Sequence, residues 1–388
     1  MTIKIAILGF GTIGSGVAEV IDINRDSIEK QIKSKIEVAH ILDLREFPDS
    51  PYADVVTSDF DKIISDKDVK IVIEAMGGAH PAYDFSLAAI NAGKHVVTSN
   101  KEVVAKFGKE LLEAAAQNGV RYLFEASVGG GIPVIRPMSD SLAGNKIVSV
   151  QGILNGTTNY ILTEMAEKGK SFDDALTEAQ QKGYAERDPS ADIEGVDSKR
   201  KIMILAALSF GMIFNENDVK ARGITHIKSE DVASVAQIGG KIKLVGFARK
   251  CGEDKIIMGV EPCVALRDNP LCSVDGVYNS ILVNANALGS VMFYGSGAGK
   301  LPTASAVVAD IMDILLNPEK KETVSFRDAD SQKLDDGYEE NADYFLVSNK
   351  ELPENLRADK ISDSGYILHD ISRNTLKSMG YESVYRVL

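Results

Sequence analysis

Two lysines of this 388-residue chain stand where a side chain could transfer a proton. Lys101 follows the strand-like segment 95–98, at the sheet rim where open α/β folds bind ligands. Lys201 opens the apolar run 202–205. A lysine at the mouth of a buried helix loses solvation, which lowers its pKa toward a value useful for acid–base chemistry. No histidine stands in a comparable motif.

Acidic residues precede Lys201 and could hold a substrate. Asp197 lies four residues before Lys201, so both side chains project from one face of a helix. Glu186 and Asp192 belong to a loop rich in Gly and Pro. Such carboxylates suit the ammonium and hydroxyl groups of an amino acid. The same residues also fit an ordinary surface ion pair in a solvated acidic loop.

A GxGxxG pattern opens the chain: Gly9-Phe10-Gly11-Thr12-Ile13-Gly14. It follows the strand-like segment 3–8 and begins the helical pattern 12–23, which is the context of a dinucleotide-binding loop. Gly9 permits the tight turn, Gly11 lets the backbone approach a pyrophosphate, and Gly14 allows close packing of helix on strand. The first N–H groups of the helix, including those of Thr12 and Ile13, would attract the phosphates. The alternative is a tight turn without a ligand.

Asp43 and Arg45 bear on the choice of dinucleotide. Asp43 ends the strand-like segment 36–43, where an acid usually binds the adenosine ribose. Arg45 could instead hold a 2′-phosphate. Asp43 thus favours NAD and Arg45 favours NADP, and of the two we expect NAD.

Strands and helices alternate through residue 125 and predict right-handed βαβ units and a parallel sheet. We expect strands at 71–73, 95–98 and 121–124 in addition to the two above, and helices at 81–91 and 106–118. The glycine-rich turn 129–133 breaks this rhythm. Beyond it we expect strands at 146–154 and 256–266 and helices at 171–182, 202–210 and 303–316.

The composition excludes several classes of protein. A net charge of −13 disfavours nucleic acid as a partner. No apolar run is long enough for a membrane span. The first residues lack the features of a signal peptide, and the three cysteines lack disulfide or metal-site spacing, so we expect a cytoplasmic protein.

Several segments, taken in order, resemble homoserine dehydrogenases. They are the glycine loop extended to 9–17, Gly77-Gly78 with Pro81-Ala82, 92–101 (AGKHVVTSNK), 125–133 (EASVGGGIP), 152–160 (GILNGTTNY), 183–201, and Gly297-Ala298-Gly299 with Pro302-Thr303-Ala304. The resemblance runs to about residue 316. It implies oxidation of L-homoserine to L-aspartate 4-semialdehyde with NAD(P), or the reverse reduction, in threonine and methionine biosynthesis.

The resemblance also implies residue roles. Glu186, Asp192 and Asp197 match the family's substrate-binding acids, and Lys201 matches its catalytic lysine. We expect Lys201 to transfer the proton and Lys101 to position substrate and cofactor, although the sequence does not separate these two roles. Further implied cofactor contacts are Ser99, Lys101 and Gly299.

A monovalent cation, Na⁺ or K⁺, is a further implication of the family. The matching positions are Glu125, Val128, Gly130 and Ile132, in the turn at the expected domain junction.

The expected fold class is α/β, a Rossmann-type doubly wound parallel sheet plus an inserted α+β substrate and dimerisation domain. The expected bounds are 1–126 with 297–316 for the dinucleotide-binding domain, 127–296 for the substrate domain, 317–343 for a linker, and 344–388 for a C-terminal extension, a shortened ACT-like piece. By resemblance the chain forms a homodimer or a dimer of dimers.

One departure from the family pattern and three rival functions qualify this interpretation. Many family members carry Arg directly before the acid that Asp43 matches, and the sequence Ile41-Leu42-Asp43 lacks it, which again favours NAD. A non-catalytic NAD-binding sensor, or a dehydrogenase of another small hydroxy amino acid, remains the alternative. Aspartate-semialdehyde dehydrogenase would need a nucleophilic mid-chain cysteine, whereas Cys251, Cys263 and Cys272 lie late and fit a buried apolar role better.

Overall fold

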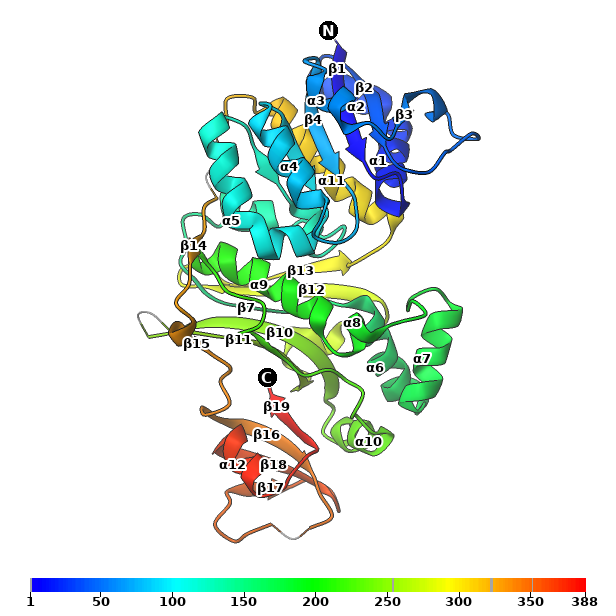
Figure 1. The fold of residues 1–388 in the computed structure, drawn as a ribbon. Helices are drawn as coiled ribbons and strands as arrows, with labels where there is room; N and C mark the ends of the chain where they lie inside the picture. Colours follow the sequence, from blue (N-terminus) through cyan, green and yellow to red (C-terminus); the bar gives the residue numbers. More distant parts are fainter. Residues whose placement is uncertain (1, 253–254, 322–323, 351) are drawn as a thin grey trace. The chain divides into compact units, whose positions relative to one another are not determined.

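The computed structural model describes residues 2–252, 255–321, 324–350 and 352–388 (Figure 1). They form two compact units, and each is described by itself. The first unit comprises Met1–Gly144, Gly211–Ile213 and Ser296–Asp328. The second comprises Asn145–Phe210, Phe214–Gly295 and Ala329–Leu388.

A six-stranded parallel sheet forms the centre of the first unit, in the order β3-β2-β1-β4-β5-β6. Its strands are β1 (Thr2–Leu8), β2 (Lys35–Leu42), β3 (Val56–Thr57), β4 (Val69–Glu74), β5 (His95–Thr98) and β6 (Tyr122–Leu123). Four consecutive residues at the end of β1 are fully buried, because helices cover both faces of the sheet. The predicted doubly wound parallel sheet is confirmed.

Helices on both faces complete the first unit. They are α1 (Thr12–Ile23), α2 (Arg25–Ile32), α3 (Phe60–Ser65), α4 (Ala82–Asn91), α5 (Lys101–Asn118) and α11 (Lys300–Leu316). Helix α11 is distant in sequence, yet it packs against α1 in one apolar core (Figure 1). A Cβ atom on Gly16 would lie 3.0 Å from the backbone oxygen of Lys300, so this glycine lets the two helices approach closely.

Helix α5 begins five residues before the predicted start at residue 106. Its N-cap is Asn100, whose Oδ1 accepts hydrogen bonds from the backbone N–H groups of Glu102 and Val103 at 3.1 and 3.2 Å. The apolar periodicity that marks the body of the helix does not show this polar first turn. Lys101 is consequently the first helical residue and not part of a loop.

An eleven-stranded mixed sheet forms the second unit, in the order β13-β12-β7-β10-β11-β19-β16-β18-β17, with β9 and β15 also paired to β11. Its main strands are β7 (Ile147–Ile153), β10 (Lys241–Cys251), β11 (Lys255–Ala265), β12 (Tyr278–Ala285), β13 (Gly289–Ser296), β16 (Asn341–Val347), β17 (Ala358–Lys360), β18 (Gly365–Ser372) and β19 (Val384–Val387). Its two-residue strands are β9 (Lys220–Ala221) and β15 (Leu334–Asp335). The first unit has a separate two-stranded pair, β8 (Met212–Ile213) with β14 (Arg327–Asp328).

The helices of the second unit include the two that the sequence predicted, at 171–182 and 202–210. The helices of this unit are α6 (Gly156–Lys168), α7 (Phe172–Gln181), α8 (Ser190–Ile193), α9 (Val196–Phe210), α10 (Ser229–Gln237) and α12 (Arg373–Ser378). Ser171 caps α7 through its Oγ, as predicted. Helix α9, which carries Asp197 and Lys201, packs on β7 and β10 (Figure 1).

The C-terminal segment, expected as an extension at 344–388, is part of the second unit. Strand β19 pairs in parallel with β11, so residues 344–388 continue the sheet of the second unit. Glu261 of β11 forms buried ion pairs with Arg373 and Arg386, which join the segment to the sheet. The expected linker 317–343 is likewise divided, because residues up to Asp328 belong to the first unit and Ala329 begins the last part of the second.

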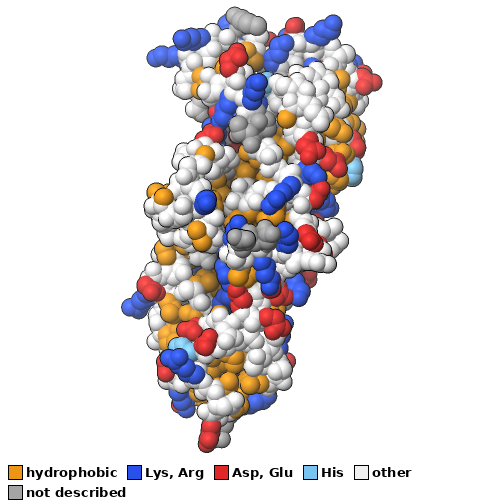
Figure 2. All heavy atoms as spheres, turned by 90° about the vertical axis from the view of Figure 1, so that its left-hand side faces the viewer, with side chains coloured by type: hydrophobic (Ala, Val, Ile, Leu, Met, Phe, Trp, Pro, Cys, Tyr) orange, Lys and Arg blue, Asp and Glu red, His pale blue; other side chains and the backbone are white. Residues whose placement is uncertain are grey.

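The surface and the cysteines agree with the composition. Acidic and basic side chains are interspersed on the face that Figure 2 shows. Within the described ranges, no helix is both long and apolar enough to cross a membrane. The three cysteines are free thiols, and burial raises the pKa of Cys263 to about 12, which keeps this thiol protonated and unreactive.

Candidate active site

The glycine loop has the geometry of a phosphate-binding turn. Gly9 has φ +90°, and a Cβ atom there would lie 2.9 Å from the backbone oxygen of Ala75. A Cβ atom on Gly14 would collide with the backbone oxygen of Gly9, so helix α1 can start only with glycine at this position. Gly11 caps α1 without a side-chain hydrogen bond, which leaves the first-turn N–H groups, those of Thr12 and Ile13 among them, to a ligand.

A pocket of about 540 Å³ lies beside this loop, at the carboxyl ends of β1, β2 and β4. The structure brings Gly9, Gly11, Asp43 and Arg45 together in its lining. Its apolar walls include Leu42, Ala75, Pro81 and Phe85. A pocket of this size with apolar walls and a few polar groups fits part of a dinucleotide.

Asp43 and Arg45 form a pair within the pocket. The Asp43 carboxylate accepts hydrogen bonds from Arg45 Nε at 3.0 Å, from Arg45 Nη2 at 2.9 Å and from the backbone N–H of Phe10 at 2.8 Å. The Arg45 guanidinium holds the pKa of Asp43 well below its usual range. Arg45 also lies over the ring of Phe47, 5.2 Å from its centroid. The sequence did not indicate that these two residues bind each other.

A buried hydrogen-bond network, which the sequence analysis missed, fixes the start of α5. Glu74 is fully buried at the end of β4; its Oε2 accepts from Thr98 Oγ1 at 2.6 Å and its Oε1 from the backbone N–H of Met76 at 2.8 Å. Burial raises the pKa of Glu74. Asn100 Nδ2 donates to the backbone oxygen of Gly78 at 2.7 Å. The N-cap type of Asn100 was the signal that could have located this network.

Three predicted cofactor residues lie at the ends of elements. Ser99 and Lys101 flank Asn100 between β5 and α5, on the same carboxyl rim of the sheet as the glycine loop. Gly299, with φ +117°, is the N-cap of α11.

Lys201 and Asp197 form a buried ion pair in the second unit. Lys201 is 8% exposed and Asp197 is 6% exposed. Lys201 Nζ donates to Asp197 Oδ2 at 2.7 Å and to the backbone oxygen of Leu154 at 2.8 Å. The pair is therefore not the solvated surface contact that the spacing alone also allowed. The backbone oxygen of Leu154, the residue after β7, is a third member of the contact.

Asn155 connects this pair to Asp192. Its Nδ2 donates to Asp192 Oδ1 at 2.7 Å and to Asp197 Oδ2 at 2.9 Å. Burial, followed by the charge of Asp197, raises the pKa of Asp192. The structure thus brings together Asp192, Asp197 and Lys201, and Asn155 is a site residue that the sequence analysis did not single out.

Glu186 is exposed and lies in the loop between α7 and α8. Its backbone oxygen accepts a hydrogen bond from Gln180 Nε2 at 3.2 Å. Thr157 Oγ1 of α6 donates to the backbone oxygen of Tyr184 at 2.6 Å and so ties this loop to the helix that Asn155 caps.

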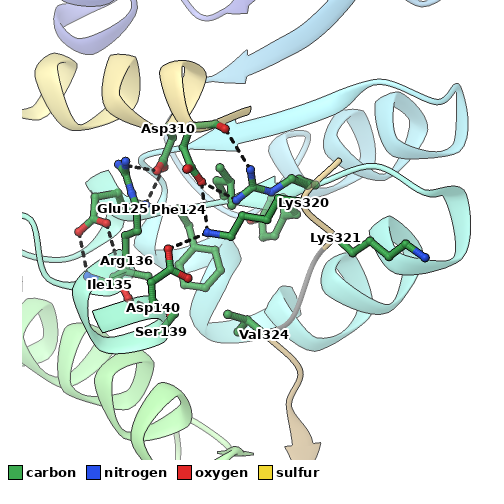
Figure 3. A pocket seen from close by; sticks show the side chains of 14 residues that line it. Phe124, Glu125, Ile135, Arg136, Ser139, Asp140, Asp310, Lys320, Lys321 and Val324 are labelled. Atoms are coloured by element: carbon green, nitrogen blue, oxygen red, sulfur yellow. Dashed lines mark hydrogen bonds and ion pairs between the residues drawn. The ribbon is translucent and has the colours of Figure 1, made fainter. Parts of the chain in front are cut away.

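Glu125 sits in a polar cluster of the first unit. Its carboxylate accepts three backbone N–H bonds, from Val134 at 2.6 Å and from Ile135 and Arg136 at 2.8 Å each. Asp310 Oδ2 of α11 accepts the Glu125 N–H at 2.9 Å, and burial raises the pKa of Asp310. Figure 3 shows these side chains gathered between α11 and the helical turn Pro137–Ser141.

The donor set of the proposed cation positions consists of oxygen atoms. A carboxylate offers about four acceptor positions, so Glu125 keeps one beyond its three N–H bonds. Gly129 and Gly130 have positive φ, and a Cβ atom on Gly130 would collide with the backbone of Gly297. Carboxylate and carbonyl oxygens suit a hard alkali cation. No group of three or more His, Cys, Asp or Glu side chains in the described part of the chain could hold a metal ion.

The fold of the first unit and the lysine cluster of the second together define the class of protein. A glycine-opened parallel sheet with a pocket at its carboxyl edge defines a dinucleotide-binding protein of the Rossmann type. The buried lysine–carboxylate cluster of the second unit adds a group able to move a proton, which is typical of a dehydrogenase.

Comparisons with known proteins give the family. Residues 9–125 match the NAD-binding domain model of homoserine dehydrogenase, and residues 133–312 match the homoserine dehydrogenase model. The homoserine dehydrogenase of Synechocystis sp. is 48% identical over 320 residues, which are 81% of this chain and 74% of the relative. The chain belongs to the homoserine dehydrogenase family.

Solved structures agree with this assignment. A homoserine dehydrogenase from Thiobacillus denitrificans has a TM-score of 0.87 at 33% identity, covering 100% of this chain and 98% of that one. A mutant of a hyperthermophilic archaeal homoserine dehydrogenase in complex with NADPH has a TM-score of 0.70 at 28% identity, covering 83% of this chain and 100% of that one.

Proposed function

We propose that this chain oxidises L-homoserine to L-aspartate 4-semialdehyde with a nicotinamide dinucleotide, and catalyses the reverse reduction, in threonine and methionine biosynthesis. The observation that carries the proposal is the cluster of the half-buried Asp192 with the buried Asp197 and Lys201, held together in a chain of this family. L-Homoserine has an ammonium, a carboxylate and a primary hydroxyl group. The carboxylates of the cluster can accept hydrogen bonds from the ammonium group, and Lys201 can exchange a proton with the hydroxyl group.

Proton transfer is assigned to Lys201. During oxidation a hydride would pass from the carbinol carbon to the bound cofactor, the hydroxyl proton would pass to Lys201 Nζ in its neutral amine form, and the C=O bond would form. In the reduction Lys201 returns that proton to the carbonyl oxygen. When bound, the nicotinamide ring supplies the hydride acceptor or donor. Asp197 Oδ2, 2.7 Å from Nζ, orients the amine for both directions.

The remaining site residues bind and orient. Asp192 and Glu186 are proposed to hold the substrate ammonium, and Lys101 at the start of α5 to position substrate and cofactor. Gly11, Thr12, Ile13 and Gly14 are proposed to hold the pyrophosphate through backbone N–H groups, with Ser99 and Gly299 as further cofactor contacts. Gly9 is proposed to form the turn that presents them, since its own N–H donates to the backbone oxygen of Leu42 at 2.8 Å.

Substitution of the lysines tests the assignment. Lys201→Ala should lower kcat by roughly 10²–10⁴-fold, the usual contribution of a general acid–base group. Lys201→Arg should fail as well, because arginine does not release its proton. Lys101→Ala should instead act mainly on KM. The measurement is the formation of reduced cofactor with L-homoserine.

A matched control for these variants is Lys199→Ala, since Lys199 lies on the same helix and its Nζ donates to the backbone oxygen of Glu216. This control should keep wild-type turnover. Near-normal kcat in Lys201→Ala with weakened substrate binding would reverse the two lysine roles, and no hydride transfer by the wild type would refute the proposed function.

NAD is the proposed preferred cofactor. The Phe10 N–H fixes the Asp43 carboxylate at the end of β2, where ribose hydroxyl groups can donate to it. A 2′-phosphate would meet the charge of this same carboxylate, and Arg45 would have to leave it. The archaeal relative solved with NADPH keeps NADP use open as the alternative.

Arg45→Ala tests the preference. Because Arg45 is the cation available for a 2′-phosphate, kcat/KM with NADP should fall roughly tenfold, about 1.4 kcal/mol, whereas kcat/KM with NAD should change little. Asp43→Asn should act in the opposite sense and reduce use of NAD. The proposal is wrong if wild-type protein prefers NADP and Arg45→Ala abolishes that preference.

We further propose that Glu125, with the backbone oxygens of Val128, Gly130 and Ile132, binds Na⁺ or K⁺. After dialysis into a buffer whose only monovalent cation is choline, activity should fall, and one of the two ions should restore it. Unchanged activity without Na⁺ and K⁺ would count against a catalytic role for the cation.

A homodimer, alone or paired as a dimer of dimers, is the proposed assembly. Strand β13 ends the sheet order of the second unit. Large apolar side chains are exposed on β7, on β12, in the turn before β13 and on β13 itself: Val148, Tyr278, Leu288, Met292 and Tyr294. An open edge with apolar side chains favours pairing with a second copy. Tyr294→Glu should convert the dimer to a monomer in analytical ultracentrifugation, and a monomeric wild type would contradict the assembly.

A further inference from the structure

We infer that Asn155 is a positioning residue that holds Asp192 and the Asp197–Lys201 pair in register with each other. The inference deepens the proposed function, because it rests on these three side chains binding and converting the substrate. Asn155 belongs to none of the groups assigned above to the chemistry. It is 5% exposed and lies between the end of β7 and the start of α6.

The orientation of the Asn155 amide is fixed from both ends. Oδ1 accepts hydrogen bonds from the backbone N–H of Thr158 at 2.9 Å and from Thr158 Oγ1 at 3.1 Å, so it caps α6. Nδ2 donates to the carboxylates of Asp192 and Asp197. A flipped amide would place its oxygen against two carboxylates and its NH₂ group against the Thr158 N–H. The hydrogen bonds to Asp192 and Asp197 and the cap of α6 would then be lost.

The two carboxylates come from different elements and need a donor between them. Asp192 lies in α8 and Asp197 in α9, and Gly195 between them has φ +82°. Each hydrogen of the Asn155 amide is shared with one carboxylate, which offsets their repulsion inside a buried site. In support of this geometry, the hydrogen bond from Asn155 lowers the pKa of Asp192 against the larger effect of burial, which raises it.

The same asparagine also acts on the proposed catalytic amine. Asp197 Oδ2 accepts from Asn155 Nδ2 at 2.9 Å and from Lys201 Nζ at 2.7 Å, so a single oxygen links the amide to the lysine. Lys201 Nζ also donates a hydrogen bond, at 2.8 Å, to the backbone oxygen of Leu154, the residue before Asn155. The end of β7 therefore restrains Nζ along two routes, and one of them passes through the Asn155 side chain.

The side chain at this position has two roles: its oxygen caps α6, and its NH₂ group donates to Asp192 and Asp197. Asparagine fills both roles, and the other common N-cap residues do not. Serine, threonine and aspartate cap helices well, because each offers an oxygen acceptor. None of them supplies an NH₂ group that can serve two carboxylates at once. Aspartate would add a third carboxylate to the cluster. Asn155→Ser therefore keeps the cap and removes the link, which separates the two roles.

The decisive variant is Asn155→Ser, measured in the full-length protein. Its kcat/KM for L-homoserine should fall about 10–100-fold, the usual effect of losing a group that orients a site residue. The acidic limb of its pH profile should move to higher pH, because Asp192 loses a donor to its charged form. Asn155→Asp should move this limb further. Binding of NADH, followed by fluorescence, should stay at the wild-type level.

The control is Ser171→Ala, which removes the N-cap of α7, where Ser171 Oγ accepts from the Asp174 N–H at 3.2 Å. This variant should lose thermal stability without a change in the pH profile. If Asn155→Ser keeps wild-type kcat/KM and pH profile, Asn155 is only a helix cap and the inference is overturned.

A readout without turnover separates this inference from the proposed function. Carboxyl ¹³C NMR titration of cofactor-free protein should show a higher pKa for Asp192 in Asn155→Ser than in the wild type. An unchanged Asp192 pKa overturns the inference even if activity falls. If the pKa rises but the wild-type chain transfers no hydride from L-homoserine, the arrangement stands and the proposed function fails.

Discussion

The start of a helix must have its first N–H groups satisfied, and two asparagines that do so position both lysines of this protein. Asn100 after β5 and Asn155 after β7 each cap the next helix with Oδ1 and donate Nδ2 elsewhere. Lys101 follows the first asparagine directly, and Lys201 bonds the residue before the second. In each unit, therefore, an asparagine N-cap between a strand and the next helix helps to fix the position of a lysine.

Buried acids organise the first unit in a similar way. Glu125 accepts three backbone N–H groups, Glu74 joins the ends of β4 and β5, and Asp43 holds the glycine loop through Phe10. Each carboxylate satisfies backbone donors where the chain leaves regular structure, so a net charge of −13 does not mean that the acids lie only on the surface. The positive potential that anionic ligands need comes from helix N-termini and lysines.

Local patterns in the sequence predicted the parts of the fold that depend on local physics. The parallel sheet and the glycine loop follow from apolar runs, glycine spacing and helix ends. The pairing of Asp43 with Arg45, the link from Asn155 to two acids and the three N–H bonds to Glu125 depend on chain segments that meet only in the folded state. The sequence also placed the start of α5 too late, because a polar first turn has no apolar periodicity.

Strand β19 lies between β11 and β16, two strands that are synthesised before it. A ribosome makes the chain from the N-terminus, so β11 and β16 are made before β19. The backbone groups through which these two strands pair with β19 stay unpaired until residues 384–387 have been made. The sheet of the second unit therefore closes only once residues 384–387 have been translated. Until then the Glu261 carboxylate lacks Arg373 and Arg386, and the nascent second unit depends on the last segment to neutralise a charge in its interior.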